Sequence, residues 1–231
     1  MREIVFDTET TGLSPLNGDR IVEIGCVEMV NRCETGRTFH SYFNPGRPMP
    51  SEAEAVHGLS DRFLSDKPAF GEVSEQLVDF IGDSPMIAHN AAFDFSFINH
   101  ELGSCGRPNV CTSRMVCTLV LARQKFPGAK HSLDALCTRF GVDRSQRIKH
   151  GALLDAQLLA QVYVELTGGR QIGLTLVAEL VEGVEALAAA DGVAPPTVTV
   201  RPPRFHGPSE QELARHAAFL ATIRDPIWNR L

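Results

Sequence analysis

The stretch IVFDTETTGL, residues 4–13, joins an apolar run to two carboxylates that stand two positions apart. The run is typical of a buried strand, and side chains along a strand alternate in direction, so Asp7 and Glu9 are expected to point to the same side. Burial of two unpaired anions is costly. We therefore expect a cation to meet them, and a divalent metal ion is the simplest one.

Outward from this stretch, the pattern predicts a mixed sheet flanked by helices. Apolar alternation predicts strands over residues 21–30 and 38–43, and a short buried strand follows at 85–89. Ser51, with Glu54 three residues on, predicts a helix start. Further helices are expected at residues 70–81, 93–102, 117–126, 132–140 and 151–166. Three strands followed by alternating helix and strand favour an α/β fold in which the acids meet at strand ends.

The chain has 231 residues, of which 43% are apolar, so we expect one catalytic domain with an appendage. After Gly169 the composition shifts to small residues and proline. We predict a catalytic domain at 1–169, a flexible linker at 170–204 and a helical tail at 205–231. In the tail, Ser209 and Glu212 form a capping-box sequence, and the helix is expected to continue until Pro226.

Charge and composition limit the function classes. A net charge of −6 argues against broad adhesion to duplex nucleic acid, so any contact with it must be local. The charged N-terminus and the lack of a long apolar run predict a cytoplasmic protein with no membrane contact. The six cysteines show no zinc-site spacing and are expected to be reduced, small and buried.

Two further blocks carry acids: HNAAFD at residues 89–94 and HGALLD at 150–155. Carboxylate oxygens suit Mg²⁺ or Mn²⁺, and two such ions about 3.5–4 Å apart can stabilise both the attacking and the leaving oxygen of a displacement. Asp94 and Asp155 complete a set of four acids with the first pair. His150, just before the last helix, is suited to accept a proton near neutral pH. Asn90 is expected to tie a strand end to a helix start by side-chain hydrogen bonds.

The three blocks in series resemble the motifs of the DEDDh-type 3′–5′ exonucleases, and more closely those of the proofreading (epsilon) subunits of bacterial DNA polymerase III. The resemblance covers about 165 residues, in order and spacing. It implies a ribonuclease H-like fold and two divalent cations. It also implies that His150 is the general base and that the metal ligands are Asp7, Glu9, Asp94 and Asp155.

The same resemblance implies contacts with a 3′ end. Thr10 and Thr11 would approach the terminal 3′-OH beside Glu9, and Leu13 would wedge against the last base, although a core position for Leu13 fits as well. Glu52 and His57, in the segment PSEAEAVHGL at 50–59, would contact the substrate. Alternatively, Glu52 serves a helix N-terminus and His57 packs in a turn.

The tail predicts partners. Residues 171–176 resemble a glutamine-led motif that docks on the sliding clamp, with Gln171, Leu174 and Leu176 as anchors; an ordinary helix stripe is the alternative. Residues 205–231 resemble a segment that binds the polymerase catalytic subunit, and docking on the catalytic domain itself is the alternative. The expected contact residues in this segment are Leu213, Leu220, Ile223 and Trp228.

The resulting hypothesis is a proofreading exonuclease that acts on a single-stranded or frayed 3′ DNA end and releases mismatched nucleotides as 5′-monophosphates. Two other functions stay open. An RNA-trimming exonuclease would use the same chemistry, and a non-catalytic adaptor would keep the fold only to join clamp and polymerase.

Overall fold

A computed structural model describes the chain at residues 1–147, 149–169 and 207–223. The chain divides into two units, Met1–Leu174 and Thr175–Leu231. The described part of the first unit contains the sheet and the predicted site. The described part of the second unit contains one helix.

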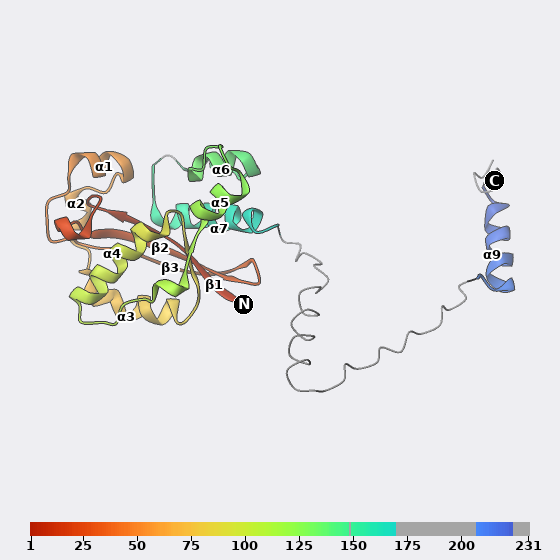
Figure 1. Ribbon diagram of the computed structural model, residues 1–231, viewed down its shortest axis with the longest axis horizontal. Helices are drawn as coiled ribbons and strands as arrows, with labels where there is room; N and C mark the ends of the chain where they lie inside the picture. Colours follow the sequence, from red (N-terminus) through yellow and green to blue (C-terminus); the bar gives the residue numbers. More distant parts are fainter. Residues whose placement is uncertain (148, 170–206, 224–231) are drawn as a thin grey trace, which may run out of the picture. The chain divides into compact units, whose positions relative to one another are not determined.

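The first unit contains a five-stranded mixed sheet with the strand order β3-β2-β1-β4-β5. β1 (Arg2–Thr10) lies at its centre, antiparallel to β2 (Ile21–Val30) and parallel to β4 (Met86–Ala88). β3 (Cys33–Tyr42) and β5 (Met115–Cys117) complete the two edges. Figure 1 shows helices on both sides of this sheet. The predicted α/β fold, three leading strands followed by parallel ones, is therefore confirmed.

The helices follow the predicted order. Those of the first unit are α1 (Ser51–His57), α2 (Asp61–Leu64), α3 (Phe70–Ile81), α4 (Ala91–Ser104), α5 (Thr118–Lys125), α6 (Leu133–Phe140) and α7 (Ala152–Leu166), with 3-10 turns at Pro15–Asn17 and Thr112–Arg114. The prediction for α3 agrees with the structure at both ends. The sequence patterns did not predict α2, the 3-10 turns or β5, all of which are four residues or shorter.

Alternation along β1 divides the core between the two faces of the sheet. Ile4 and Phe6 belong to the cluster that contains residues of α3 and α4. Val5 belongs to the cluster formed with α7. The same alternation directs Asp7 and Glu9 to the α7 face and the residue between them, Thr8, to the α4 face.

The two predicted helix starts differ in outcome. The helix start at Ser51 is confirmed by α1, although Pro50 occupies the cap position and no side chain caps the helix. The prediction that the Asn90 side chain ties a strand end to a helix start was wrong. Asn90 precedes α4, but its side chain makes no capping hydrogen bond. Asn90 instead adopts a left-handed conformation, with φ of 63°. Asparagine tolerates this conformation better than most residues, so its contribution is a sharp backbone turn into α4.

The cysteines are all free, as expected, but only Cys26 and Cys137 are buried. Cys33, Cys105 and Cys111 are exposed. The expectation that the cysteines are buried was therefore wrong for these three, which lie in the β2–β3 hairpin and after α4, at the edges of the core.

The second unit contains α9 (Glu210–Leu220), whose capping box is present. The Ser209 hydroxyl accepts from the backbone N–H of Glu212, and the Glu212 carboxylate accepts from the backbone N–H of Ser209 at 2.8 Å. The helix ends at Leu220, earlier than predicted, so Ile223 lies beyond it. No residue of α9 is buried, and Leu213 is 52% exposed.

A close approach at Gly25 sets the start of α7 against the sheet. Gly25 pairs with Asp7 across β2 and β1. A Cβ atom at this position would lie 2.3 Å from backbone atoms of Leu153, two residues before Asp155. Only glycine leaves room for the helix here, and the contact holds the first turn of α7 directly beside Asp7.

Gly25→Ala is therefore expected to destabilise the protein by about 2 kcal/mol or more, since the added methyl group meets backbone that cannot rotate away. Thermal unfolding measures this loss. Gly103→Ala is the matched control, because its nearest neighbour is a side-chain atom of Asn109 at 3.7 Å and its backbone is helical. Equal stability of the two variants would show that α7 does not depend on Gly25.

Candidate active site

Three segments bring the five predicted catalytic residues to one cavity of about 520 Å³. Asp7 and Glu9 come from the end of β1. Asp94 and Asp155 lie in the first turns of α4 and α7, and His150 lies just before α7. The predicted convergence of these side chains is therefore found. It arises because β1 ends between the N-termini of two helices, one on each face of the sheet.

Asp94 and Asp155 are buried acids, and the N-termini of their helices stabilise their negative charge. Asp94 is 2% exposed and Asp155 is 3% exposed. Unpaired N–H groups at a helix N-terminus attract negative charge, which favours an acid in the first turn. Asp94 also accepts a hydrogen bond of 2.7 Å from the Thr8 hydroxyl, so the residue between the two β1 acids supports the third acid from the opposite face.

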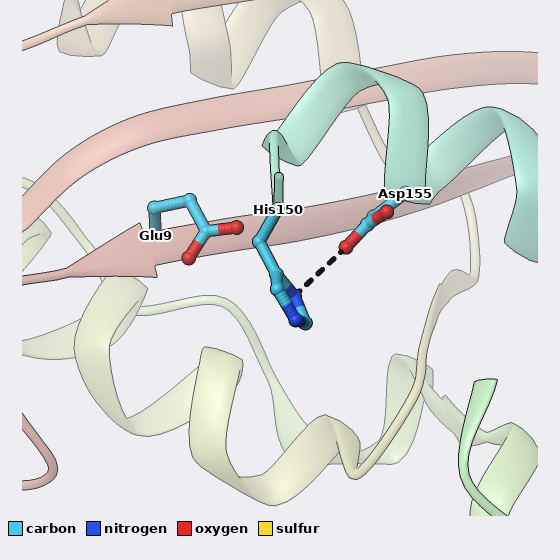
Figure 2. A group of neighbouring side chains, drawn as sticks. All are labelled: Glu9, His150 and Asp155. Atoms are coloured by element: carbon cyan, nitrogen blue, oxygen red, sulfur yellow. Dashed lines mark ion pairs between the residues drawn. The ribbon is translucent and has the colours of Figure 1, made fainter. Parts of the chain in front are cut away.

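Glu9, His150 and Asp155 lie close enough to share one ion, with a ligand atom of each within 4.8 Å of the others. Figure 2 shows these three side chains and the pair between Nδ1 of His150 and Asp155, which are 3.3 Å apart. The His150 side chain is 48% exposed, whereas Asp155 is buried. His150 thus lies at the mouth of the cavity, within reach of solvent.

Burial raises the proton affinity of the acids. It is the main cause that raises the pKa of Glu9 to about 8, and Asp155 and Glu23 add to the effect. Burial also raises the pKa of Asp94 to about 7, against the opposing hydrogen bond from Thr8. The pKa of Asp7 is raised by burial and then by Asp94 and Glu9. Such a cluster attracts cations, and its oxygen donors suit a hard divalent ion.

Arg147 places a positive charge directly on one of the acids of the cavity. Its Nε and Nη2 atoms donate to the two carboxylate oxygens of Asp155, at 2.5 and 2.6 Å. Nη2 also lies 2.8 Å from Nδ1 of His150, and Nη1 donates to Asp134 at 2.8 Å. No local sequence pattern singles out Arg147. The sequence does indicate that a cation must lie beside the four acids, but we predicted only a metal ion in that role.

A second cavity, of about 570 Å³, adjoins the first and shares Thr8, Glu9 and Phe93 with it. The predicted substrate-binding residues all line it: Glu9, Thr10, Thr11, Leu13, Glu52 and His57. Leu13 is 86% exposed, so a core position for it is excluded. Glu52 is exposed in the first turn of α1.

His57 is buried with one ring nitrogen engaged. Nδ1 accepts a hydrogen bond of 3.0 Å from the backbone N–H of Leu59, so the ring proton of the neutral side chain lies on Nε2. Nε2 is the one buried side-chain polar atom without a partner in the described parts of the chain. Burial lowers the pKa of His57. The geometry thus leaves a neutral donor group beside the second cavity.

A family model described as exonuclease, RNase_T, matches residues 4–163, the segment that contains all five predicted catalytic residues. The chain belongs to this exonuclease family. The predicted enzyme class, a hydrolase that removes nucleotides from a 3′ end, is confirmed. Divalent metal ions are general to this family, and the buried oxygen donors described above fit them.

Two relatives of this exonuclease from different bacteria carry the same name. A DNA polymerase III subunit epsilon from Rickettsia felis is 48% identical over 228 residues, which cover 96% of this chain and 97% of the relative. A DNA polymerase III subunit epsilon from Escherichia coli (strain K12) is 47% identical over 176 residues, which cover 73% of this chain and 72% of the relative.

Solved exonuclease structures share the fold. A structure of exonuclease X in complex with 5′ overhanging duplex DNA is 27% identical, has a TM-score of 0.56, and covers 71% of this chain and 90% of its own. The nuclease domain of 3′hExo, a DEDDh family member bound to rAMP, is 16% identical, with a TM-score of 0.62. It covers 72% of this chain and 91% of its own, and shows likeness of fold.

Other residues of the exonuclease site were not anticipated. His89, Arg123 and His131 also line the first cavity. Nδ1 of His89 lies 2.9 Å from the Thr118 hydroxyl, which fixes the ring. His89 opens the HNAAFD block, whereas Arg123 and His131 have no distinctive spacing with the acids, so the sequence alone offered no signal for these two.

Several predicted residues of the exonuclease lie outside the described residues: Gln171, Leu174, Leu176 and Trp228. The linker prediction at 170–204 also falls there. Within the described ranges, no helix combines the length and apolar character needed to cross a membrane.

The metal-free exonuclease is expected to lose stability as pH rises. Because the pKa of Glu9 is about 8 in the folded chain against an ordinary value of 4.5, the folded chain holds a proton that the unfolded chain releases between these values. Glu9→Gln keeps the shape and removes the charge. In chelator it should stabilise the protein more at about pH 8 than at about pH 5, by up to about 1.4 kcal/mol per pH unit.

Thermal unfolding at the two pH values measures this difference. Glu52→Gln is the control, because this carboxylate is exposed to water and should give the same small change at both. A benefit of Glu9→Gln that does not grow with pH would contradict a buried charge at Glu9.

Proposed function

We propose that the chain is the proofreading subunit of a bacterial replicative DNA polymerase. It removes mismatched 3′-terminal nucleotides as 5′-monophosphates, with two divalent cations, Mg²⁺ or Mn²⁺, and acts in the cytoplasm. The observation that carries this proposal is the convergence of four acids and His150 on one cavity. The relatives named DNA polymerase III subunit epsilon support the polymerase context.

The residues have distinct tasks in the proposed reaction. Asp7, Glu9, Asp94 and Asp155 hold the divalent cations, which supply charge stabilisation to the attacking and leaving oxygens. His150 accepts the proton of the attacking water. Its half-exposed position at the cavity mouth suits this task, since the proton must then pass to solvent.

The second cavity is the proposed site of the terminal nucleotide. Leu13 lines this cavity with an apolar side chain that the described residues leave 86% exposed, which suits contact with a base. The Nε2–H group of His57 is a buried hydrogen-bond donor without an acceptor among the described residues, and a nucleotide has several acceptor atoms. Thr10 and Thr11 line the same cavity and supply backbone groups for the 3′-OH.

Preference for a mismatch follows from the cost of separating the strands. The two cavities accept a single strand, and a mispaired end frays at a lower cost than a paired one. The net charge of −6 disfavours tight binding of duplex DNA by this chain alone. Attachment to a polymerase would instead raise the local concentration of exonuclease at the primer end.

The tail is the proposed means of attachment. We divide the chain into a catalytic domain at 1–169, a linker with a clamp-binding motif at 170–204 and a polymerase-binding tail at 205–231. The exposed apolar side chains of α9 support the last assignment, because a short amphipathic helix requires a partner surface. Leu213 and Leu220 share one side of this helix by their spacing, and Ile223 and Trp228 extend the proposed contact.

Replacement of an acid tests the chemistry. Asp7→Ala or Asp155→Ala should abolish metal-dependent hydrolysis of a single-stranded oligonucleotide, because each removes a metal ligand. His150→Ala should lower turnover by about 10²-fold or more while the affinity for Mn²⁺ is largely kept. Asp143→Ala is the control, since this acid is exposed near the same loop and outside the cavity. Retained activity in the Asp7 variant of a pure preparation would overturn the site.

A pair of exposed leucines tests the substrate cavity. Leu13→Ala should raise KM for single-stranded DNA several-fold, because it removes the contact with the terminal base. Its stability should change by less than about 0.5 kcal/mol, since the side chain is 86% exposed. Leu16→Ala is the matched control, as Leu16 is 89% exposed on the same loop and does not line the cavity. Equal KM values for the two variants would exclude the role of Leu13.

Two sets of tail variants test the partners reciprocally. The double change Leu213→Ala and Leu220→Ala should weaken binding to the polymerase catalytic subunit by about tenfold or more and leave clamp binding intact. Gln171→Ala with Leu174→Ala should do the reverse. Arg215→Ala, on the opposite side of α9 by spacing, is the control. Measured dissociation constants that do not separate in this way would contradict the assignment of the tail.

A further inference from the structure

The strongest unexplained feature of the site is the position of Arg147. Its Nε and Nη2 atoms engage both oxygens of Asp155, Nη2 also contacts His150, and Nη1 contacts Asp134. The Arg147 side chain is 9% exposed and that of Asp155 is 3% exposed. The cation therefore lies inside the cavity, on the acid that is a proposed metal ligand.

This arrangement also occupies His150. A guanidinium can only donate, so at 2.8 Å the Nδ1 atom of His150 must accept from Arg147. The ring proton of the neutral side chain then lies on Nε2. Neither ring nitrogen is free to take a proton while this contact persists, so His150 cannot act as a base in this arrangement.

Binding of a divalent ion and the guanidinium to Asp155 at the same time would have a high electrostatic free energy. Like charges repel strongly at such short separations in a buried site. Asp134 offers Arg147 an alternative, because its side chain is 48% exposed and already bonded to Nη1. A shift of the guanidinium toward Asp134 would open Asp155 without expelling Arg147 from the loop.

We propose that Arg147 is an exchangeable counterion and positioning residue: it holds Asp155 and His150 when divalent ions are absent, and it withdraws to Asp134 when they bind. This inference rests on the metal site of the proposed function. Ion binding thereby releases His150 for proton transfer, so the base becomes available only in the metal-loaded enzyme.

Competition of this kind lowers the apparent affinity for the ion, because only the fraction of molecules with Asp155 open can bind it. In the full-length protein, Arg147→Ala should therefore bind Mn²⁺ about tenfold or more tightly than the unaltered chain, as measured by titration calorimetry. Arg147→Lys should also bind more tightly, since lysine cannot form the two parallel bonds.

Arg144→Ala is the matched control. Arg144 pairs with the same Asp134 at 2.8 Å, but it is not among the residues that line the first cavity. Its removal takes away an equal charge and should leave the Mn²⁺ affinity within about twofold. If Arg144→Ala tightens binding as much as Arg147→Ala, or if Arg147→Lys binds like the unaltered chain, general charge explains the effect and the proposal is overturned.

A second readout follows His150 itself. In ¹⁵N-labelled protein, Mg²⁺ should move the ring-nitrogen resonances of His150 in the unaltered chain. In metal-free Arg147→Lys they should already lie near the metal-loaded positions. Identical metal-free positions in both proteins would overturn the release of His150. Equal Mn²⁺ affinities in all variants overturn only this inference, whereas no Mn²⁺ binding by any of them overturns the proposed function as well.

Discussion

The site depends on one electrostatic constraint: four carboxylates share a cavity in which three of them have almost no contact with water. Burial raises the pKa values of Glu9 and Asp7, and the neighbouring ionised acids raise them further. The helix N-termini and the Thr8 hydroxyl offset part of the cost. The folded chain therefore holds carboxylates whose ionised form is destabilised by burial. A cation that enters the cavity stabilises that ionised form.

The rest of the fold serves to create and maintain this cluster. Alternation along β1 sends Asp7 and Glu9 toward α7, and Thr8 toward α4. Gly25 allows α7 to begin against the sheet beside Asp7. At the other side, Arg20 makes two bonds to the buried Glu101 of α4, at 2.7 and 2.6 Å, and so ties the loop after β1 to that helix.

Prediction from sequence succeeded where a local pattern is sufficient. The strand at 21–30 and the helix at 70–81 have strong periodicity, and the acids lie at element ends that such patterns locate. It failed where the outcome depends on distant partners. β5 has three residues and exists through pairing with β4. Arg147 was overlooked because its role comes from Asp155 and Asp134, and the exposure of Leu13 depends on a loop that no periodicity describes.

The order of the elements has a consequence for synthesis of the chain. β1 precedes the other described elements and lies at the centre of the sheet, whereas α7 is the last helix in the described part of the same unit. The Tyr163 hydroxyl of α7 bonds to Glu3 of β1, 160 residues away in sequence. Contacts this distant form late. A growing polypeptide on the ribosome thus lacks Asp155, the fourth acid, until this helix has been translated, so unfinished chains carry an incomplete acid cluster.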